Sequence, residues 1–125
     1  MISRREAEFY HAQLVRAHGG STGLRDAGLL DAALNRPFAT VGGEDLFPTH
    51  FDKAAAIMHG IITGHPFLDG NKRTGYELGR LLLQEGGHDI EAPLDERYDM
   101  VIQAATGRLD VDGIKAWLID HSKPL

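Results

Sequence analysis

Apolar residues recur along most of this chain at the three- and four-residue spacing of amphipathic helices. Glycines and prolines interrupt this spacing, and capping residues precede several of the apolar runs. The pattern predicts about six helices joined by short connections. It shows no repeat, low-complexity tract or linker. We therefore expect an all-α fold, a compact bundle that forms a single domain over residues 1–125.

The first two predicted helices lie on either side of a glycine-rich stretch. Ser3 and Glu6 have the spacing of a capping box, so a helix should begin there. The residues expected to face the core from this helix are Phe9, Tyr10, Leu14 and Val15. The segment 19–23, Gly-Gly-Ser-Thr-Gly, should end it. Asp26 is placed to cap a second helix, which Pro37 ends. Its expected core residues are Leu29, Leu30, Ala33 and Leu34.

The centre of the chain combines an aperiodic segment with a strongly apolar helix. Residues 38–48 contain Gly42-Gly43 and show no clear period, which indicates a short flap, either a loop or a small hairpin. Thr49 and Asp52 should open a third helix that ends near Gly64. Its expected core residues are Phe51, Ala55, Met58, Ile61 and Ile62.

Three more helices are predicted in the second half of the chain. Asn71 is suited to cap the fourth, which Gly86-Gly87 should end. The fifth and sixth should follow Pro93 and Asp110. Their expected core residues are Leu78, Leu81 and Leu82 in the fourth helix, Leu94, Tyr98, Val101 and Ile102 in the fifth, and Val111, Ile114, Trp117 and Leu118 in the sixth.

Composition narrows the possible environment and partners. The net charge is −5, which argues against general electrostatic binding of nucleic acid or of anionic membranes but leaves room for a local cationic site. The chain has no cysteine, so disulfides, thiolate metal sites and cysteine nucleophiles are excluded. The N-terminal residues do not resemble a signal peptide, and no apolar run approaches the roughly 20 residues of a membrane span. We expect a cytoplasmic protein.

One stretch, residues 65–75, reads His-Pro-Phe-Leu-Asp-Gly-Asn-Lys-Arg-Thr-Gly and contains most of the candidate chemistry. If Asn71 caps the following helix, the first backbone N–H groups of that helix are free donors at the positive end of its dipole. Gly70 allows the sharp turn that this requires. Lys72 and Arg73 add positive charge at the N-terminus of the helix, where the helix dipole disfavours it. A bound anion should therefore compensate this charge. The pattern indicates a phosphate site.

Two further residues of this stretch suggest what would happen to the phosphate. Asp69 would repel a phosphate unless a cation lies between them. Its carboxylate oxygens are ligands that suit Mg²⁺. His65 lies close to the same helix start, and an imidazole has the pKa of a general base for an acceptor hydroxyl. Phe67 should anchor the loop in the core, and Pro66 should stiffen it.

Each of these residues also has an ordinary structural interpretation. A lone histidine is more often structural than catalytic, and Asp69-Gly70-Asn71 could be a tight turn followed by a cap. Lys72 and Arg73 could simply be solvated. Their combination within nine residues, His65 to Arg73, favours phosphate chemistry over these separate explanations.

The string His-Pro-Phe-x-Asp-Gly-Asn-Lys-Arg resembles the signature of the Fic/Doc family, and in particular its Doc (death on curing) branch. Other segments of the chain resemble Doc proteins as well, so that the resemblance covers nearly the whole length. These segments are 23–30 with Arg36-Pro37, 52–56, and Gly107-Arg108-Leu109 with Trp117-Leu118.

The resemblance implies a compact all-α Fic/Doc-like fold with the motif between two central helices. It implies that His65 is the catalytic base and that Asp69 holds Mg²⁺. The nucleotide phosphates would be bound by Gly70, Asn71, Lys72 and Arg73. For Arg25 two roles are open, orientation of the site or contact with an antitoxin, and a structural ion pair with Asp26 or Asp31 is at least an equal alternative.

Lys72 bears on which group is transferred. Family members that transfer AMP usually have glycine at this position, and often a second arginine three residues beyond Arg73, where this chain has Tyr76. A lysine side chain would occupy the space of the α-phosphate in the AMP-transferring pose. Doc proteins with Asn-Lys-Arg are kinases that use ATP to phosphorylate a threonine of elongation factor Tu and so stop translation. The resemblance therefore favours a toxin with protein kinase activity.

Two other functions are compatible with the sequence: a protein nucleotidyltransferase, and a catalytically silent module that binds an antitoxin. The inhibitory Ser/Thr-x-x-x-Glu helix of many family members is not matched, because Ser3 has Ala7 at the required position. The resemblance therefore implies restraint by a separately encoded Phd-like antitoxin.

Overall fold

The computed structural model describes all 125 residues and consists mainly of helices. The helices are α1 (Arg4–His18), α2 (Ala27–Asn35), the 3-10 helix η1 (Arg36–Phe38), α3 (His50–Gly64), α4 (Asn71–Glu85), α5 (Leu94–Ala105) and α6 (Val111–Asp120). The strands are β1 (Thr40–Val41), β2 (Glu44–Asp45), β3 (His88–Ile90) and β4 (Ser122–Pro124). The six α-helices confirm the predicted all-α class and, within one or two residues, their predicted limits.

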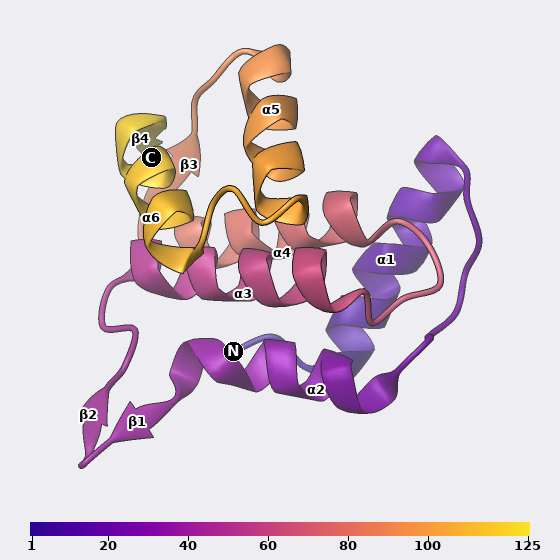
Figure 1. Cartoon of the computed structure of the whole chain (residues 1–125), viewed down its shortest axis with the longest axis horizontal. Coiled ribbons are helices and arrows are strands. Elements are labelled where there is room, and N and C mark those ends of the chain that lie inside the picture. The colour runs from indigo at the N-terminus through magenta and orange to yellow at the C-terminus, as the bar shows by residue number, and fades with distance from the viewer.

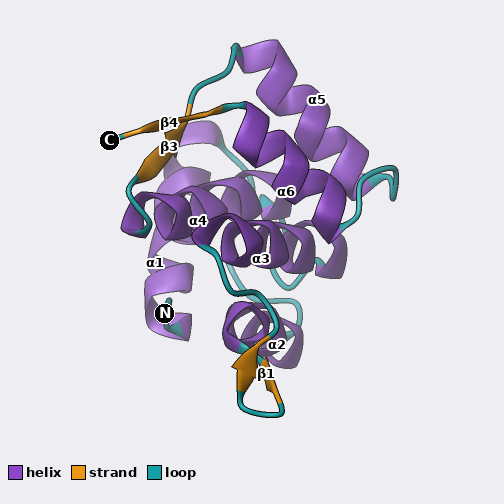
Figure 2. Ribbon diagram, turned by 90° about the vertical axis from the view of Figure 1, so that its left-hand side faces the viewer, coloured by secondary structure: helices purple, strands orange, loops and turns teal.

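Helices α3 and α4 lie side by side through the centre of the molecule, as Figure 1 shows. Helices α5 and α6 cover them on one side and α2 on the other, while α1 crosses near the end where α3 passes into α4 (Figures 1 and 2). The fully buried side chains of α3, among them Ile57, Met58, Ile61 and Ile62, form the middle of one continuous core. None of the helices combines the length and apolar character needed for a transmembrane span.

Two glycines on α4 allow the central pair of helices to approach closely. A Cβ added at Gly75 would lie 2.8 Å from Cγ1 of Ile62, and one added at Gly79 would overlap the side chain of Met58. A larger residue at either position would displace the buried side chain of Ile62 or Met58, or move α4 away from α3. This spacing matters for function because the same two helices hold the two ends of the 65–70 loop.

The predicted start signals of α1 and α3 are confirmed. The hydroxyls of Ser3 and Thr49 accept hydrogen bonds from the N–H groups of Glu6 and Asp52, and both acidic side chains bond back to the cap residue. These reciprocal bonds satisfy otherwise free N–H groups at the helix start.

Several predicted core positions are wrong. Phe9 is 57% exposed, Leu94 74% and Tyr98 68%, and Leu29 is also exposed. In α1 the buried stripe runs through Ala7, His11 and Val15 instead. An outer helix of this bundle buries only a narrow stripe, so apolar residues beside that stripe stay at the surface.

The structure has two small sheets, each of two antiparallel strands. The predicted flap at residues 38–48 is a hairpin of β1 and β2, and the Nζ of Lys53 donates to the carbonyl of Phe47 at its base. The pairing of β3 with β4 was not predicted. It brings the segment that follows α4 against residues 122–124, and no local sequence pattern predicts this contact.

A bidentate ion pair between Arg80 and Asp89 fixes β3 to α4. Arg80 Nε lies 2.8 Å from Asp89 Oδ1, and Arg80 Nη2 lies 3.0 Å from Asp89 Oδ2. The guanidinium holds the pKa of Asp89 down to about 2, and the carboxylate raises the pKa of Arg80. The pair therefore stabilises the native state only while Asp89 is ionised.

We expect Asp89→Asn to lower the free energy of unfolding at neutral pH by on the order of 1 kcal/mol, since Arg80 is partly exposed and solvent screens the pair. The native pKa of Asp89 lies below its unfolded value of 3.8. The contribution is therefore present above the unfolded pKa and is lost as the pH falls toward 2. Urea unfolding across this range measures it. Glu91→Gln, which removes an exposed pair with Lys123, is the matched control and should change little. An equal loss in both variants would contradict the prediction.

Candidate active site

The loop between α3 and α4 starts with a residue in an uncommon backbone conformation. His65 ends α3 with φ 51° and ψ 54°, and it is the only non-glycine residue with positive φ. Its N–H donates to the carbonyl of Ile61 at 3.2 Å. The side chain is exposed. Backbone strain of this kind persists where surrounding contacts enforce it, and it is often found at functional sites.

The middle of the loop is anchored in the core, as predicted. Phe67 is 1% exposed and stacks on the ring of His11, with ring centroids 3.9 Å apart. His11 is itself 2% exposed, and its Nε2 lies 2.7 Å from the carbonyl oxygen of Asp69. Because a carbonyl can only accept, Nε2 must carry the proton of this hydrogen bond. The buried pair therefore fixes the loop backbone on its α1 side.

Asn71 was expected to cap α4, and this prediction is wrong. The cap residue is Gly70, with φ 74°, and Asn71 is the first residue of the helix. Its carboxamide turns back into the loop, where Oδ1 accepts from the N–H of Phe67 at 2.9 Å and Nδ2 donates to its carbonyl at 3.0 Å. The side chain is thus used to brace the loop. Its backbone N–H remains free for a ligand.

The start of α4 has the open geometry of an anion site. Gly70 offers no side chain as a cap, and the first N–H that bonds to a backbone carbonyl there is that of Thr74, to Gly70 at 3.0 Å. The N–H groups of Asn71, Lys72 and Arg73 precede it and have no such partner. Both cationic side chains are exposed, and neither forms an ion pair. Free donors and unpaired cations therefore gather at the positive end of a helix dipole.

Asp69 lies beside this helix start with its carboxylate exposed. Oδ1 accepts from the N–H of Gly70 at 2.9 Å, and Oδ2 lies 3.3 Å from the backbone nitrogen of Ser21. A Cβ at Gly20 would come within 2.7 Å of Oδ2, so glycine is needed for this close approach. Each carboxylate oxygen keeps a lone pair that a cation could use.

No group of three or more histidine or acidic side chains is arranged to hold a metal by itself. The donor set is the single exposed carboxylate of Asp69 beside an anion site. That set fits Mg²⁺, which commonly binds through one or two carboxylates together with substrate phosphates and water.

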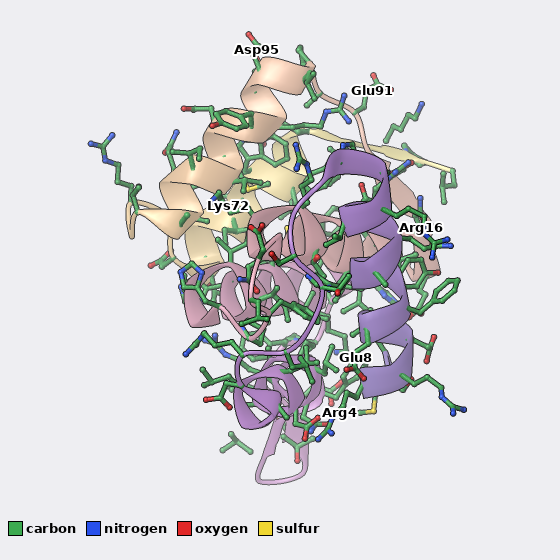
Figure 3. The ribbon with its side chains drawn as sticks, turned by 90° about the vertical axis from the view of Figure 1, so that its right-hand side faces the viewer. Arg4, Glu8, Arg16, Lys72, Glu91 and Asp95 are labelled. Atoms are coloured by element: carbon green, nitrogen blue, oxygen red, sulfur yellow. The ribbon has the colours of Figure 1, made fainter.

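A cleft of about 1000 Å³ opens next to the helix start, between α1, α4 and α5. Figure 3 shows Lys72 between these helices, whereas Arg16 points outward from α1. The residues that line the cleft are Leu14, His18, Asp69, Gly70, Asn71, Lys72, Arg73, Tyr76, Glu77, Leu94, Asp95, Arg97, Tyr98 and Val101. The structure thus brings together the predicted metal and phosphate residues. His65 lies outside this lining, at the other end of the loop.

The cleft also contains residues that the motif could not indicate. Arg97 of α5 has a buried Nε without a hydrogen-bond partner. Burial raises the pKa of Tyr76, and the neighbouring guanidinium of Arg97 partly opposes that rise. Leu94 and Tyr98, expected in the core, form an exposed apolar wall beside it. For Leu94 and Tyr98 the only signal was the helical period, which predicted burial instead, and no sequence signal indicated Arg97.

Arg25 contacts the backbone of the loop and forms neither of the ion pairs considered for it. Its Nε donates to the carbonyl of His65 at 2.6 Å, and its Nη2 donates to that of Gly64 at 2.8 Å. Asp31 pairs with Arg4 instead, while Asp26 caps α2 through the N–H of Leu29. A guanidinium at the end of α3 satisfies carbonyls that the helix leaves free.

Known proteins are similar to most of this chain. Residues 2–83 match the Fic/DOC family. The chain is similar to Toxin Doc of Mycolicibacterium smegmatis, with 41% identity over 104 residues, which cover 82% of this chain and 80% of that protein. It is also similar to Protein kinase doc of Escherichia phage P1, with 31% identity over 114 residues, which cover 90% and 88% of the two proteins. The matched regions include all of the residues from His65 to Arg73. This chain therefore belongs to the Fic/DOC family, in its Doc toxin branch.

Proposed function

We propose that this protein is the toxin of a type II toxin–antitoxin module, a kinase that transfers the γ-phosphoryl group of ATP to a hydroxyl of a translation factor. The acceptor we expect is a threonine of elongation factor Tu. The observation that carries this proposal is the open start of α4, where three free N–H groups, Lys72 and Arg73 stand beside Asp69. The names of the two relatives, a toxin and a protein kinase, support it.

In this proposal the nucleotide and the acceptor approach from different sides. The cleft between α1, α4 and α5 receives the nucleotide, with its phosphates at the N–H groups of Asn71, Lys72 and Arg73. The imidazole of His65 is exposed and lies outside the cleft, where a protein hydroxyl can reach it. The six-residue loop between α3 and α4 connects the two positions.

The reaction uses the imidazole of His65 and the donors at the start of α4 directly. His65 takes the proton of the acceptor hydroxyl as its oxygen attacks the γ-phosphorus. The bond from that phosphorus to the β–γ bridging oxygen breaks, and ADP leaves. The N–H groups and cations at the start of α4 stabilise the charge that develops on the phosphate oxygens.

Asp69 is the residue that would hold Mg²⁺ in this proposal. When bound, Mg²⁺ would neutralise part of the phosphate charge. The N–H groups of Gly70 and Ser21 hold the carboxylate in place. Loss of this carboxylate in an Asp69→Asn variant should therefore weaken binding of ATP in the presence of Mg²⁺ more than in its absence.

Transfer of the γ-phosphoryl group is favoured over transfer of AMP by Lys72. This side chain lines the cleft and has no carboxylate partner. An ammonium there competes for the space of an α-phosphate but can pair with terminal phosphate oxygens. A separately encoded Phd-like antitoxin is part of the same proposal, because a growth-arresting kinase needs restraint in the cell that makes it.

The test compares two labelled forms of ATP. The purified protein is incubated with Mg²⁺ and a bacterial lysate, together with ATP labelled at either the γ- or the α-phosphate. We expect label from γ-labelled ATP in a protein of the size of elongation factor Tu, and none from α-labelled ATP. Label from α-labelled ATP would establish nucleotidyl transfer instead. Absence of any label, ATP binding and toxicity would leave the silent antitoxin-binding module as the better account.

A further inference from the structure

The backbone of His65, in its uncommon conformation, is hydrogen-bonded to Arg25, which lies 40 positions earlier in the chain. A non-glycine residue in the left-handed region costs on the order of 1 kcal/mol or more, so contacts must enforce it. The last carbonyls of α3 are available to make such contacts because no later N–H of the helix reaches them. Arg25 supplies donors to the carbonyl of Gly64, the last residue of α3, and to that of the cap residue His65.

The geometry of the two hydrogen bonds fixes the orientation of the peptide on either side of His65. Nε and Nη2 of one guanidinium are rigidly coplanar, so the two carbonyls they meet are held in a fixed mutual direction. The distances, 2.6 Å to His65 and 2.8 Å to Gly64, are those of charge-assisted bonds. A side chain attached to a peptide held in this way has little freedom except rotation about its own bonds.

The backbone around Arg25 is itself attached to the loop. The N–H groups of Arg25 and Asp26 donate to the carbonyl of Pro66 at 2.8 and 3.0 Å. The N–H of Leu68 donates to the carbonyl of Gly23 at 3.1 Å, and Leu24 forms a β-bridge with Phe67. The segment 23–26 therefore runs along the loop like a short strand and places the guanidinium beside His65.

We propose that Arg25 is a positioning residue that orients His65 for catalysis by holding the carbonyls of Gly64 and His65. This proposal rests on the proposed role of His65 as the base. Arg25 acts through the backbone and does not line the cleft that would receive the nucleotide. Its loss should therefore affect the turnover step and leave nucleotide binding intact.

The first test separates a positioning role from a purely structural one by kinetics. In Arg25→Met the apolar stem remains but both donors are lost. We expect kcat to fall about 10- to 100-fold with the KM for ATP nearly unchanged. Arg25→Lys, which keeps a donor, should recover part of the loss. The control is Arg4→Met, which removes an arginine that joins α1 to α2 through Asp31. It should keep the wild-type kcat.

A double substitution then asks whether Arg25 acts through His65. In a His65→Ala background, Arg25→Met should cause no further loss of activity, because the group it orients is already absent. A full additional 10- to 100-fold loss in this background, or an unchanged kcat in Arg25→Met alone, would overturn the proposal.

A measurement without ATP keeps the inference independent of the kinase assignment. The imidazole C–H signals of His65 are assigned in NMR spectra by their absence in His65→Ala. We expect Arg25→Met to shift or broaden them, while Arg4→Met leaves them unchanged. If the wild-type protein transfers no phosphate but the His65 signals still respond, the proposed function fails and the orienting contact stands. If the signals do not respond, the orienting contact is refuted whatever the activity.

Discussion

Replacement of His65 should abolish growth arrest and reduce phosphoryl transfer by about 10²- to 10⁴-fold, the usual contribution of a general base. The side chain is exposed and lies outside the cleft, so ATP binding should remain. Two variants distinguish the loss of the imidazole from a change in the backbone conformation at this position. His65→Ala removes the imidazole, and His65→Asn removes it with a residue that tolerates the left-handed conformation observed here.

Initial rates with γ-labelled ATP and growth after induction measure the effect. Both variants should show only this residual transfer rate while keeping a melting temperature close to that of the wild type. The matched control is His59→Gln, a half-buried histidine of the same helix that lies beside Arg36. Its growth arrest should match that of the wild type. Persistent growth arrest in His65→Asn would refute the assignment of the base.

Replacement of Asn71 should cost both stability and activity. Asn71→Ala leaves the buried N–H and carbonyl of Phe67 without partners, at roughly 1–3 kcal/mol for each unsatisfied group. For the two groups together, we expect the free energy of unfolding to fall by about 2–6 kcal/mol. The loop that carries His65 and Asp69 should loosen, and phosphoryl transfer should fall with it. Urea unfolding and initial rates measure the two effects on the same preparation.

Lys72→Ala is the comparison that separates bracing from ligand binding. Lys72 is exposed and unpaired, so this variant should keep its stability while its affinity for ATP falls. A direct role of the Asn71 carboxamide in phosphate binding would give the opposite result for Asn71→Ala, namely weaker ATP binding at unchanged stability. The structure favours bracing because both ends of the amide are already engaged.

Local signals in the sequence predicted the helices well. The capping boxes at Ser3 and Thr49 depend on hydrogen bonds between residues three positions apart, and both form. The period of apolar residues likewise predicted α3, whose side chains are buried along much of its surface. The same period misplaced Phe9, Leu94 and Tyr98, because it gives the direction of an apolar face but not the width of the surface that another helix covers.

The sequence by itself determined the helical class and the chemical groups of the loop, because helix caps, glycine turns and the order of residues 65–75 are properties of adjacent positions. Tertiary structure decided where each group lies and what it contacts. It engaged the Asn71 amide within the loop, separated His65 from the cleft, and placed His11 and Arg25 against loop carbonyls 58 and 40 residues away. Contacts over such separations arise only when α1 and the 23–26 segment pack against the loop. No pattern within a single segment encodes that packing.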